Sequence, residues 1–434
     1  MKLKLIAVIL AFTLGAVALF STVSDSMEKE ATYSRYIEKA RMNADKDIPY
    51  NAYQNYKQAF EIHCEDEDVF REYLEQSKLL GEDYYAKAIE EYAKHFPQSE
   101  LACELLCRRY YDQGNYKSVI TTALDARDKG VATEQVRNWY LECTYMLKNI
   151  RSGLEEAGAF VGGYARIKAN GVYGFIMSNG KYLIAPRYEQ ASVFLNGNAA
   201  VLEDGRWQMI NSLGFRVALT DTPVDSMSVM VNGKIPVSRD GKYGYTDVSL
   251  IVPEQMEYDY AGTFKNGVAA VKKGGKWALI DASEQPITEF IFDEIVLDEY
   301  DTCINAGVIF VRKDGKYYMM NAEGAKISEQ SFDYVQPFAS GKLAAVCIGG
   351  AWGFADTTGS IVIEPQYENA RSFGADLGGV CIDGLWGYIS SNGTIRVECQ
   401  FEDCRPFSTD GIAAVKQGDT WQYVQLLGYQ VHGG

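Results

Sequence analysis

The sequence predicts an α+β multi-domain protein, with an N-terminal signal or membrane anchor, an α-helical hairpin module and an all-β repeat array. Three observations predict this organisation. An apolar run follows two lysines at the N-terminus, apolar residues then recur with the period of a helix, and one aromatic residue returns about every 35 residues through the last two thirds of the chain. The expected parts are a signal or anchor over 1–24, a linker and first helix over 25–48, a helical module over 49–151 and a β-repeat domain over 159–434.

The N-terminal segment has the features of an export signal. Lys2 and Lys4 precede an apolar run from Leu5 to Phe20, and a basic start before an apolar core is typical of a secretory signal. The run is short for a membrane span of about 20 residues, but Ser21 to Val23 extend it, so a cleaved signal and a retained anchor are both open. Because lysines favour the cytoplasmic side, we expect an exported chain, secreted or membrane-anchored, with its repeats outside. A buried N-terminal helix is the alternative.

The charge balance argues against two kinds of partner. The chain has 42 Lys and Arg against 58 Asp and Glu, and its formal net charge is −16. Nucleic-acid binding needs clustered cations that neutralise phosphates, and anionic lipid surfaces attract the same residues. We therefore expect no nucleic-acid partner, and contact with a membrane only through the N-terminal segment.

Nine cysteines are unusual in an exported chain, which generally pairs its thiols. Their spacing matches no zinc template. Cys103 and Cys107 fall on one face of a predicted helix, and we interpret them as two small buried hydrophobes. Cys347 and Cys381 hold the same place in adjacent repeats and are expected to face outward, where a disulfide requires Cα atoms within about 7 Å.

The helical module is indicated by few Gly and Pro residues and by helical periodicity. Ile89, Tyr92 and Phe96 lie on one apolar face, and Pro97 ends that helix.

Two segments in this module share a glycine followed by an aromatic residue. They are Leu80-Gly81-Glu82-Asp83-Tyr84 and Gly114-Asn115-Tyr116. These segments resemble the core of tetratricopeptide repeats, which are helix hairpins of about 34 residues, and the two glycines are separated by about the length of one such hairpin. The resemblance implies a peptide-binding or packing module, and a helical spacer is the alternative.

The array over 159–434 is defined by one aromatic residue in each of eight units. Successive aromatics are 34, 36, 34, 40, 35, 34 and 35 residues apart, and five of the six Trp residues stand in this register. The interval of 40 residues places an extended loop within 284–306. We interpret the eight aromatics as structural residues of the repeat: Tyr173, Trp207, Tyr243, Trp277, Tyr317, Trp352, Trp386 and Trp421.

The positions around each aromatic repeat with it. A dipeptide such as Asp204-Gly205 stands just before the aromatic and suits a two-residue hairpin turn. Ile or Val stands six residues before it and a large apolar residue two residues after it, so both side chains share one face of the strands. A second turn and a third strand follow, as in Ser360 to Pro365. Each unit is expected to be a three-stranded meander whose apolar face is buried by stacking on its neighbours.

Several repeats share a more specific pattern. Tyr243-Gly244, Trp352-Gly353 and Trp386-Gly387 keep an aromatic-Gly pair, and Pro365 to Glu368 form a Pro-x-Tyr-acid segment. These residues resemble the WG repeat family of bacterial proteins. The resemblance covers about two thirds of the chain and implies a β-repeat domain, but no activity. A closed β-propeller, which we favour, and an open β-solenoid both fit, and no element that would join the first and last units is identified.

The search for catalytic residues leaves only carboxylates. His63, His95 and His432 stand in no H-E-x-x-H pattern, and no nucleophile elbow, phosphate loop or dinucleotide motif occurs. Acidic residues follow an aromatic in most repeats, but a glycosidase pair would be unique, whereas these recur. We therefore expect them to accept hydrogen bonds from turn N–H groups. They are Glu189, Asp259, Asp293, Asp333, Glu368 and Glu402.

The sequence thus predicts a non-enzymatic binding or scaffold protein of the cell envelope, without a catalytic, cofactor or metal site. The repeat array would present a surface to a protein or glycan partner, and the helical module would dock a partner. A carbohydrate-active propeller enzyme is one alternative and would show a unique acidic pair with aromatic platforms. A cytoplasmic interaction protein is the other, and it explains the nine cysteines better.

Overall fold

The computed structural model describes residues 25–432, so the predicted signal or anchor over 1–24 lies outside the described residues. The chain falls into two units, Met1–Cys143 and Thr144–Gly434, which are treated separately below. Within the described part of the chain, every helix is too short or too polar to span a bilayer.

The first unit is a helical module, as predicted. A helix over 25–45 precedes a series of shorter helices. Asp66, Ser99 and Asn115 stand at the N-caps of three of them, and each side chain accepts a hydrogen bond from a backbone N–H of the first turn. The helices are α2 (Pro49–Phe60), α3 (Glu67–Leu79), α4 (Glu82–His95), α5 (Glu100–Asp112), α6 (Tyr116–Asp128) and α7 (Glu134–Tyr145).

The helices repeat as hairpins. The starts of α3 and α5, and those of α4 and α6, are each separated by about 34 residues, the length of a tetratricopeptide unit. Gly81 and Gly114 lie in the turns that join the two helices of each hairpin, with φ of 108° and 66°. Glycine is favoured there because a β-carbon disfavours positive φ. The shared spacing of Gly81 and Gly114 therefore marks the turns of a hairpin repeat, and the likeness to tetratricopeptide repeats stays a prediction.

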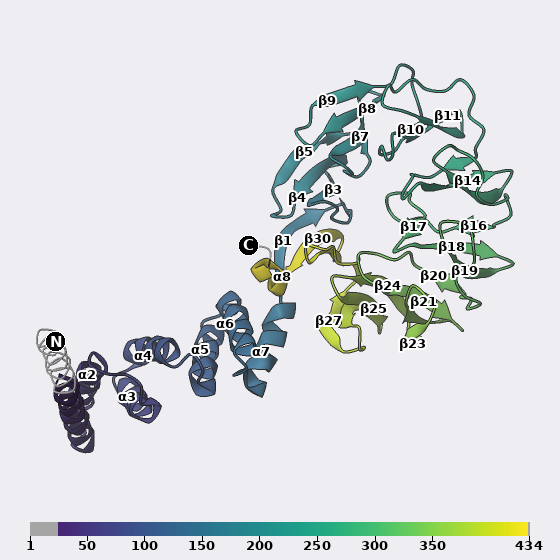
Figure 1. The fold of residues 1–434 in the computed structure, drawn as a ribbon. Helices are drawn as coiled ribbons and strands as arrows, with labels where there is room; N and C mark the ends of the chain where they lie inside the picture. The colour runs from purple at the N-terminus through teal and green to yellow at the C-terminus, as the bar shows by residue number, and fades with distance from the viewer. Residues whose placement is uncertain (1–24, 433–434) are drawn as a thin grey trace, which may run out of the picture. The chain divides into compact units, whose positions relative to one another are not determined.

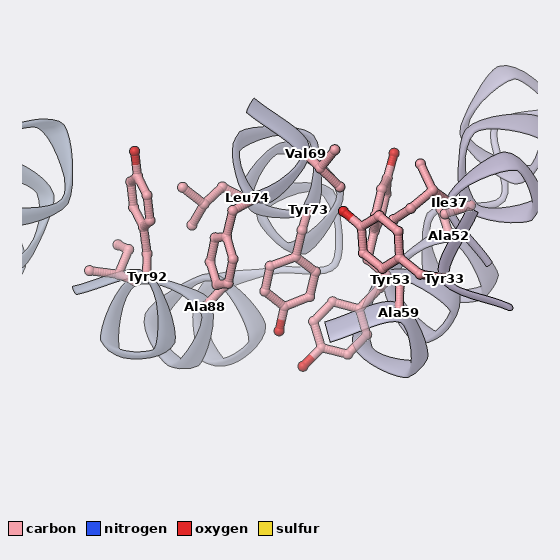
Figure 2. Packing of buried hydrophobic residues seen from close by; sticks show 14 of the residues in the cluster. Tyr33, Ile37, Ala52, Tyr53, Ala59, Val69, Tyr73, Leu74, Ala88 and Tyr92 are labelled. Carbon is pink, nitrogen blue, oxygen red and sulfur yellow. The ribbon is translucent and has the colours of Figure 1, made fainter. Parts of the chain in front are cut away.

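Aromatic rings form the core of this module (Figure 2). Tyr53 stacks on Tyr73 with ring centroids 5.0 Å apart, and Phe70 stacks on Tyr92 at 5.3 Å. Tyr73 and Tyr92 are fully buried. Such rings bury large apolar areas while their hydroxyl groups still need partners.

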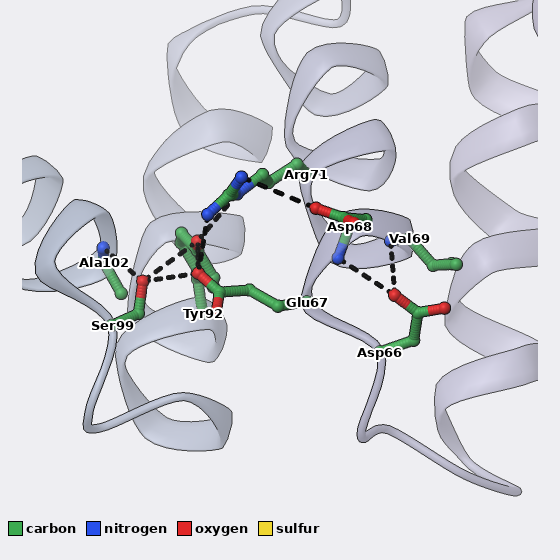
Figure 3. Close-up of polar contacts among 8 residues, drawn as sticks. All are labelled: Asp66, Glu67, Asp68, Val69, Arg71, Tyr92, Ser99 and Ala102. Atoms are coloured by element: carbon green, nitrogen blue, oxygen red, sulfur yellow. Dashed lines mark hydrogen bonds and ion pairs between the residues drawn. The ribbon is translucent and has the colours of Figure 1, made fainter.

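One carboxylate satisfies several of these polar groups (Figure 3). Glu67 at the start of α3 accepts hydrogen bonds from the Tyr92 hydroxyl of α4 at 2.5 Å and from the Ser99 hydroxyl at the N-cap of α5 at 2.6 Å. Arg71 forms an ion pair with the same carboxylate at 3.1 Å. The hydrogen bonds from Ser99 and Tyr92 hold the pKa of Glu67 below its ordinary value. Glu67 thus ties three successive helices together.

The second unit is an eight-bladed β-propeller, and its described strands form eight antiparallel sheets. Blade 1 contains β2 (Glu156–Ala157), β3 (Tyr164–Ala169), β4 (Val172–Met177) and β5 (Tyr182–Tyr188). Blade 2 contains β6 (Gln190–Ala191), β7 (Asn198–Glu203), β8 (Arg206–Asn211) and β9 (Arg216–Leu219). Blade 3 contains β10 (Ser226–Met227), β11 (Ile235–Arg239) and β12 (Lys242–Thr246), and blade 4 contains β13 (Tyr260–Ala261), β14 (Val268–Lys273) and β15 (Lys276–Asp281).

The remaining blades follow the same order. Blade 5 contains β16 (Glu294–Ile295), β17 (Ile304–Asn305), β18 (Val308–Lys313) and β19 (Lys316–Met320). Blade 6 contains β20 (Tyr334–Val335), β21 (Ala344–Ile348), β22 (Ala351–Ala355) and β23 (Ile361–Tyr367). Blade 7 contains β24 (Asn369–Gly374), β25 (Leu377–Ile382), β26 (Leu385–Ser390) and β27 (Ile395–Phe401), and blade 8 contains β28 (Asp403–Cys404), β29 (Ile412–Gln417) and β30 (Thr420–Leu426).

The predicted three-stranded meander omitted one strand. In most blades a two-residue strand, such as β2 or β6, pairs with the strand that precedes the hairpin. Two residues are too few to show an alternating pattern, so the sequence carried no sign of them. In blades 3 to 5 the last strand is reduced to isolated bridges such as Tyr243↔Tyr258 and Trp277↔Phe292.

The ring is closed by a strand that lies outside the repeats. Strand β1 (Leu147–Leu154) pairs antiparallel with β30, with Leu147 opposite Leu426 and Leu154 opposite Trp421. Figure 1 shows β1 beside the yellow C-terminal strand β30, although they are far apart in the sequence. The last blade is therefore built from both ends of the second unit, and this excludes the open solenoid. Closure removes two exposed sheet edges.

The predicted core positions are buried. Ile167 and Val201, six residues before their aromatics, are fully buried, as are Phe175 and Phe354 two residues after theirs. Tyr423 joins the last blade to the first, because its buried hydroxyl donates to the carbonyl of Gly158 at 2.6 Å.

Candidate interaction sites on the propeller

The repeat aromatics lie within the blades. Tyr173 pairs across the strands with Tyr188, and Trp386 pairs with Phe401, and each partner is the last residue of the following strand. Trp207 is buried, and its indole N–H donates to the carbonyl of Asp225. These positions suit packing between strands more than stacking on a ligand.

The repeated carboxylates accept hydrogen bonds from hairpin turns, as predicted. Glu189 accepts from the N–H of Gly205 at 3.1 Å, and Glu368 accepts from the N–H of Gly384 at 3.0 Å. The acceptor always precedes the turn glycine by 16 residues in these pairs, and the same geometry holds for Asp259, Asp333 and Glu402. The group was larger than the sequence indicated, because Glu155 and Asp225, which follow no aromatic, cap the turns at Gly171 and Gly241.

Lysines reinforce some of these caps. Lys242 contacts Asp259 at 2.6 Å, and this hydrogen bond, followed by that from the Gly275 N–H, lowers the pKa of Asp259. Lys276 contacts Asp293 in the same way. The acidic residues are thus engaged in holding turns.

All nine cysteines lie within the described residues and are unpaired there. The expectation that Cys347 and Cys381 face outward was wrong, because both are buried, opposite Trp352 and Trp386 in the neighbouring strands. Cys107 is buried on α5, and burial raises the pKa of its thiol to about 12. Among the described residues, no cluster of His, Cys, Asp or Glu is arranged to hold a metal ion.

The long repeat interval forms a loop that crosses the ring. Residues 296–303 follow β16 in blade 5, and we call them the cross-ring loop. Its Glu299 carboxylate accepts from the backbone N–H of Ala159 in blade 1 at 3.0 Å and from Nη1 of Arg405, which follows β28 of blade 8, at 3.4 Å. Since blades 1 and 5 are opposite in a ring of eight, the loop spans the inner side of the propeller.

The cross-ring loop is held in shape by its own polar groups. Asp298 accepts from the backbone N–H groups of Tyr300 and Thr302, each at 2.9 Å. Asp301 binds blade 4 twice, through the Tyr260 hydroxyl at 2.7 Å and through its carbonyl to the N–H of Thr263. Burial raises the pKa of Asp301 above its ordinary value.

Exposed apolar side chains are concentrated on two segments of blades 2 and 3. The two segments meet at Asp221, because its N–H donates to the carbonyl of Leu250 and its carboxylate accepts from the N–H of Val252. Five large apolar side chains on these segments are each more than half exposed, led by Leu213 at 74%. The rim patch, as we name it, consists of Leu213, Phe215, Val217, Val248 and Ile251.

The segments that match a known repeat family follow the spacing of the repeat aromatics. The WG containing repeat matches residues 173–207, 255–277, 352–386 and 386–421. Three of these segments run from one repeat aromatic to the next, and the fourth ends on Trp277. The chain is a WG repeat-containing protein. A bacterial origin stays a prediction for this WG repeat protein.

No curated protein matches the sequence of this WG repeat protein. Among solved structures, Kluyveromyces lactis Hsv2p is 12% identical, with 50% of this chain and 85% of that chain covered and a TM-score of 0.34. A eukaryotic initiation factor is 13% identical, with 63% and 87% covered and a TM-score of 0.41. BBS1N, in complex with ARL6DN, is 12% identical, with 64% and 96% covered and a TM-score of 0.33.

Two features of the WG propeller were not found by sequence reasoning. The 40-residue interval predicted an extended loop, but not that Glu299 would reach Arg405 on another blade. The rim patch was not predicted either. The available signal was that blade 2 departs from the Pro-x-Tyr-acid pattern, with Thr220-Asp221-Thr222 where other repeats keep an aromatic.

Proposed function

We propose that this WG repeat protein is a non-enzymatic interaction protein of the cell envelope, and that the rim patch is the surface on which its propeller binds a protein partner. The observation that carries the proposal is the concentration of exposed apolar side chains on blades 2 and 3. Contiguous exposed apolar surface is uncommon on soluble proteins and marks interaction sites. A repeat propeller is itself a scaffold suited to protein interaction.

The charge of the patch indicates the partner's chemistry. Residues 213–219 and 248–252 contain one charged side chain, Arg216, in a chain whose net charge is −16. An acidic second copy would be repelled over the rest of its surface. A partner with an apolar centre and a carboxylate near Arg216 fits best, because apolar cores with a polar rim are typical of such interfaces.

The location in the envelope rests on the N-terminal sequence. Lys2 and Lys4 before the apolar run from Leu5 to Phe20 support export, and the propeller would then face the outside. The helical module would dock a second partner or place the propeller at a distance from the membrane. The glycosidase alternative is not favoured, since the repeated carboxylates that it would use are engaged in turns.

The test of the patch is a matched comparison. A triple variant, Leu213→Ser, Phe215→Ser and Ile251→Ser, should lose proteins that crosslink to the wild-type chain in the native host. Tyr334→Ser in blade 6, where Tyr334 is 61% exposed, is the control and should keep them. Direct binding of a recovered protein should weaken at least about tenfold in the triple variant, because central apolar residues dominate interface energies. Equal recovery by all three proteins contradicts the patch.

Location is tested separately. We expect externally added protease to cut the propeller in intact cells from which the outer layers have been removed. Full protection, with an intact Met1 in the cytosolic fraction, contradicts the envelope assignment and leaves the patch proposal standing.

A further inference from the structure

The cross-ring loop delivers one carboxylate to a place where donors of two other blades meet. Glu299 links this loop to blade 8 through Arg405, and it also contacts blade 1 through Ala159. The long interval between Trp277 and Tyr317 supplies the extra residues that make this reach possible. The carboxylate therefore lies at the seam where the ring is closed.

Two donors at the seam would lose an acceptor without Glu299. Arg405 lies over the ring of Trp421 at 5.4 Å, and Tyr423 of the same strand joins blades 8 and 1 through its hydroxyl. Arg166 of β3 is engaged elsewhere, because it donates to the carbonyl of Ala191 at 2.8 Å. The Arg405 guanidinium and the backbone N–H of Ala159 would thus remain at the seam if Glu299 were absent.

Glu299 satisfies these donors incompletely. Its Oε2 accepts from both Ala159 and Arg405, the latter at a long 3.4 Å, while its Oε1 accepts from the Tyr300 hydroxyl at 3.3 Å. The Nε of Arg405 is buried and finds no hydrogen-bond partner among the described residues. A guanidinium binds a carboxylate best through two parallel N–H bonds, which Glu299 does not make. An anion that accepted hydrogen bonds from both Nη1 and Nε of Arg405 would satisfy the Nε donor, which now lacks a partner.

We propose that Arg405 and the Ala159 N–H form a carboxylate-binding site at the closure seam, which Glu299 occupies as an internal ligand. The external ligand is a carboxylate, from a small organic acid or from an acidic side chain of a peptide. Exchange is feasible because the Glu299 and Arg405 side chains are 31% and 38% exposed. Other charged groups near the loop are paired, because Lys265 of blade 4 contacts Asp298 at 3.8 Å and Asp301 accepts from the Tyr260 hydroxyl of blade 4.

The test uses the full chain and acetate as the probe. Glu299→Ala should lower the Tm of the propeller by roughly 2–4 °C, and acetate at constant ionic strength should restore at least about half of this loss. Chloride should not. Wild-type protein should bind acetate at least about tenfold more weakly than Glu299→Ala, because a tethered carboxylate competes at a high effective concentration.

The control variant also removes Arg405, the group that would bind acetate. Glu299→Ala combined with Arg405→Met should show no rescue by acetate, and equal rescue of both variants overturns the proposal. If Glu299→Ala fails to fold, Glu299→Gln is used, and failure of acetate to bind it overturns the proposal as well. An acidic peptide that binds more tightly than acetate identifies a peptide carboxylate as the source, and equal affinity identifies a small acid.

Discussion

Closure of the ring by β1 makes one residue of this strand a sensitive test of the fold. Leu154 is 1% exposed and packs in the core shared by blades 8 and 1, with Ile167, Ile412 and Tyr423. Leu154→Ala removes apolar atoms from a site with little freedom to collapse, because the opposing strands are fixed by their ladders. The expected cost is about 2–5 kcal/mol of the free energy of unfolding. In a domain of this size, each kcal/mol lost from the free energy of unfolding lowers Tm by roughly 2–4 °C.

The assay is urea and thermal unfolding followed by tryptophan fluorescence. Trp421, one of six tryptophans, lies directly opposite Leu154 in the adjacent strand, so part of the emission comes from this seam. Lys148→Ala is the matched control, because Lys148 is exposed on the same strand and pairs with Gln425. We expect the control to match wild type within about 0.5 kcal/mol.

The outcome that would refute the reasoning is an unchanged unfolding midpoint for Leu154→Ala. It would mean that β1 is not part of the cooperative propeller and that the last blade is completed in another way. Equal losses for Leu154→Ala and Lys148→Ala would also contradict the role of the buried face.

Three further predictions follow from other parts of the molecule. The pKa of Glu67 is held below its ordinary value of 4.5, so its contribution to stability is present above pH 4.5 and is lost as the pH falls through the lowered pKa. Glu67→Gln should therefore reduce the loss of stability of the helical module at acidic pH, measured by circular dichroism as a function of pH. Gly374→Ala should lower Tm by several degrees or prevent folding, since a β-carbon there would overlap the Phe407 carbonyl, whereas Gly384→Ala, with open space around it, should cost only the strain of its positive φ. All nine thiols should be alkylated in denaturant without prior reduction, and fewer than nine labelled sites by mass spectrometry would contradict the unpaired state. In the native protein at about pH 8, Cys303 should resist alkylation, because burial raises the pKa of its thiol to about 12.

Much of the propeller could be predicted because it repeats. A single hairpin such as that at Asp204-Gly205 is a weak signal, but eight hairpins in one register are not matched by chance. The repeated carboxylates were interpreted correctly for the same reason. Repetition argues for a structural role, and Glu189 and Glu368 do accept turn N–H groups.

The unrepeated features could not be predicted in the same way. Strand β1 carries no repeat aromatic and no hairpin dipeptide, and it precedes the register by about 20 residues. The outward placement expected for Cys347 failed because a short side chain beside Trp352 is covered, whereas the lysines that hold this position elsewhere extend to solvent. At this repeat position, exposure to solvent therefore depends on the length of the side chain.

The sequence by itself determined the order of helical module and β-repeats, the number of blades and the face of each strand that is buried. These properties depend on neighbours within about 40 residues, where spacing and side-chain chemistry are sufficient. The tertiary structure alone decided that β1 closes the ring, that Glu299 reaches the seam and that the segments of blades 2 and 3 that carry exposed apolar residues meet at Asp221. Those contacts join residues that are distant in the chain, and their partners are selected by the curvature of the whole ring and not by any local pattern.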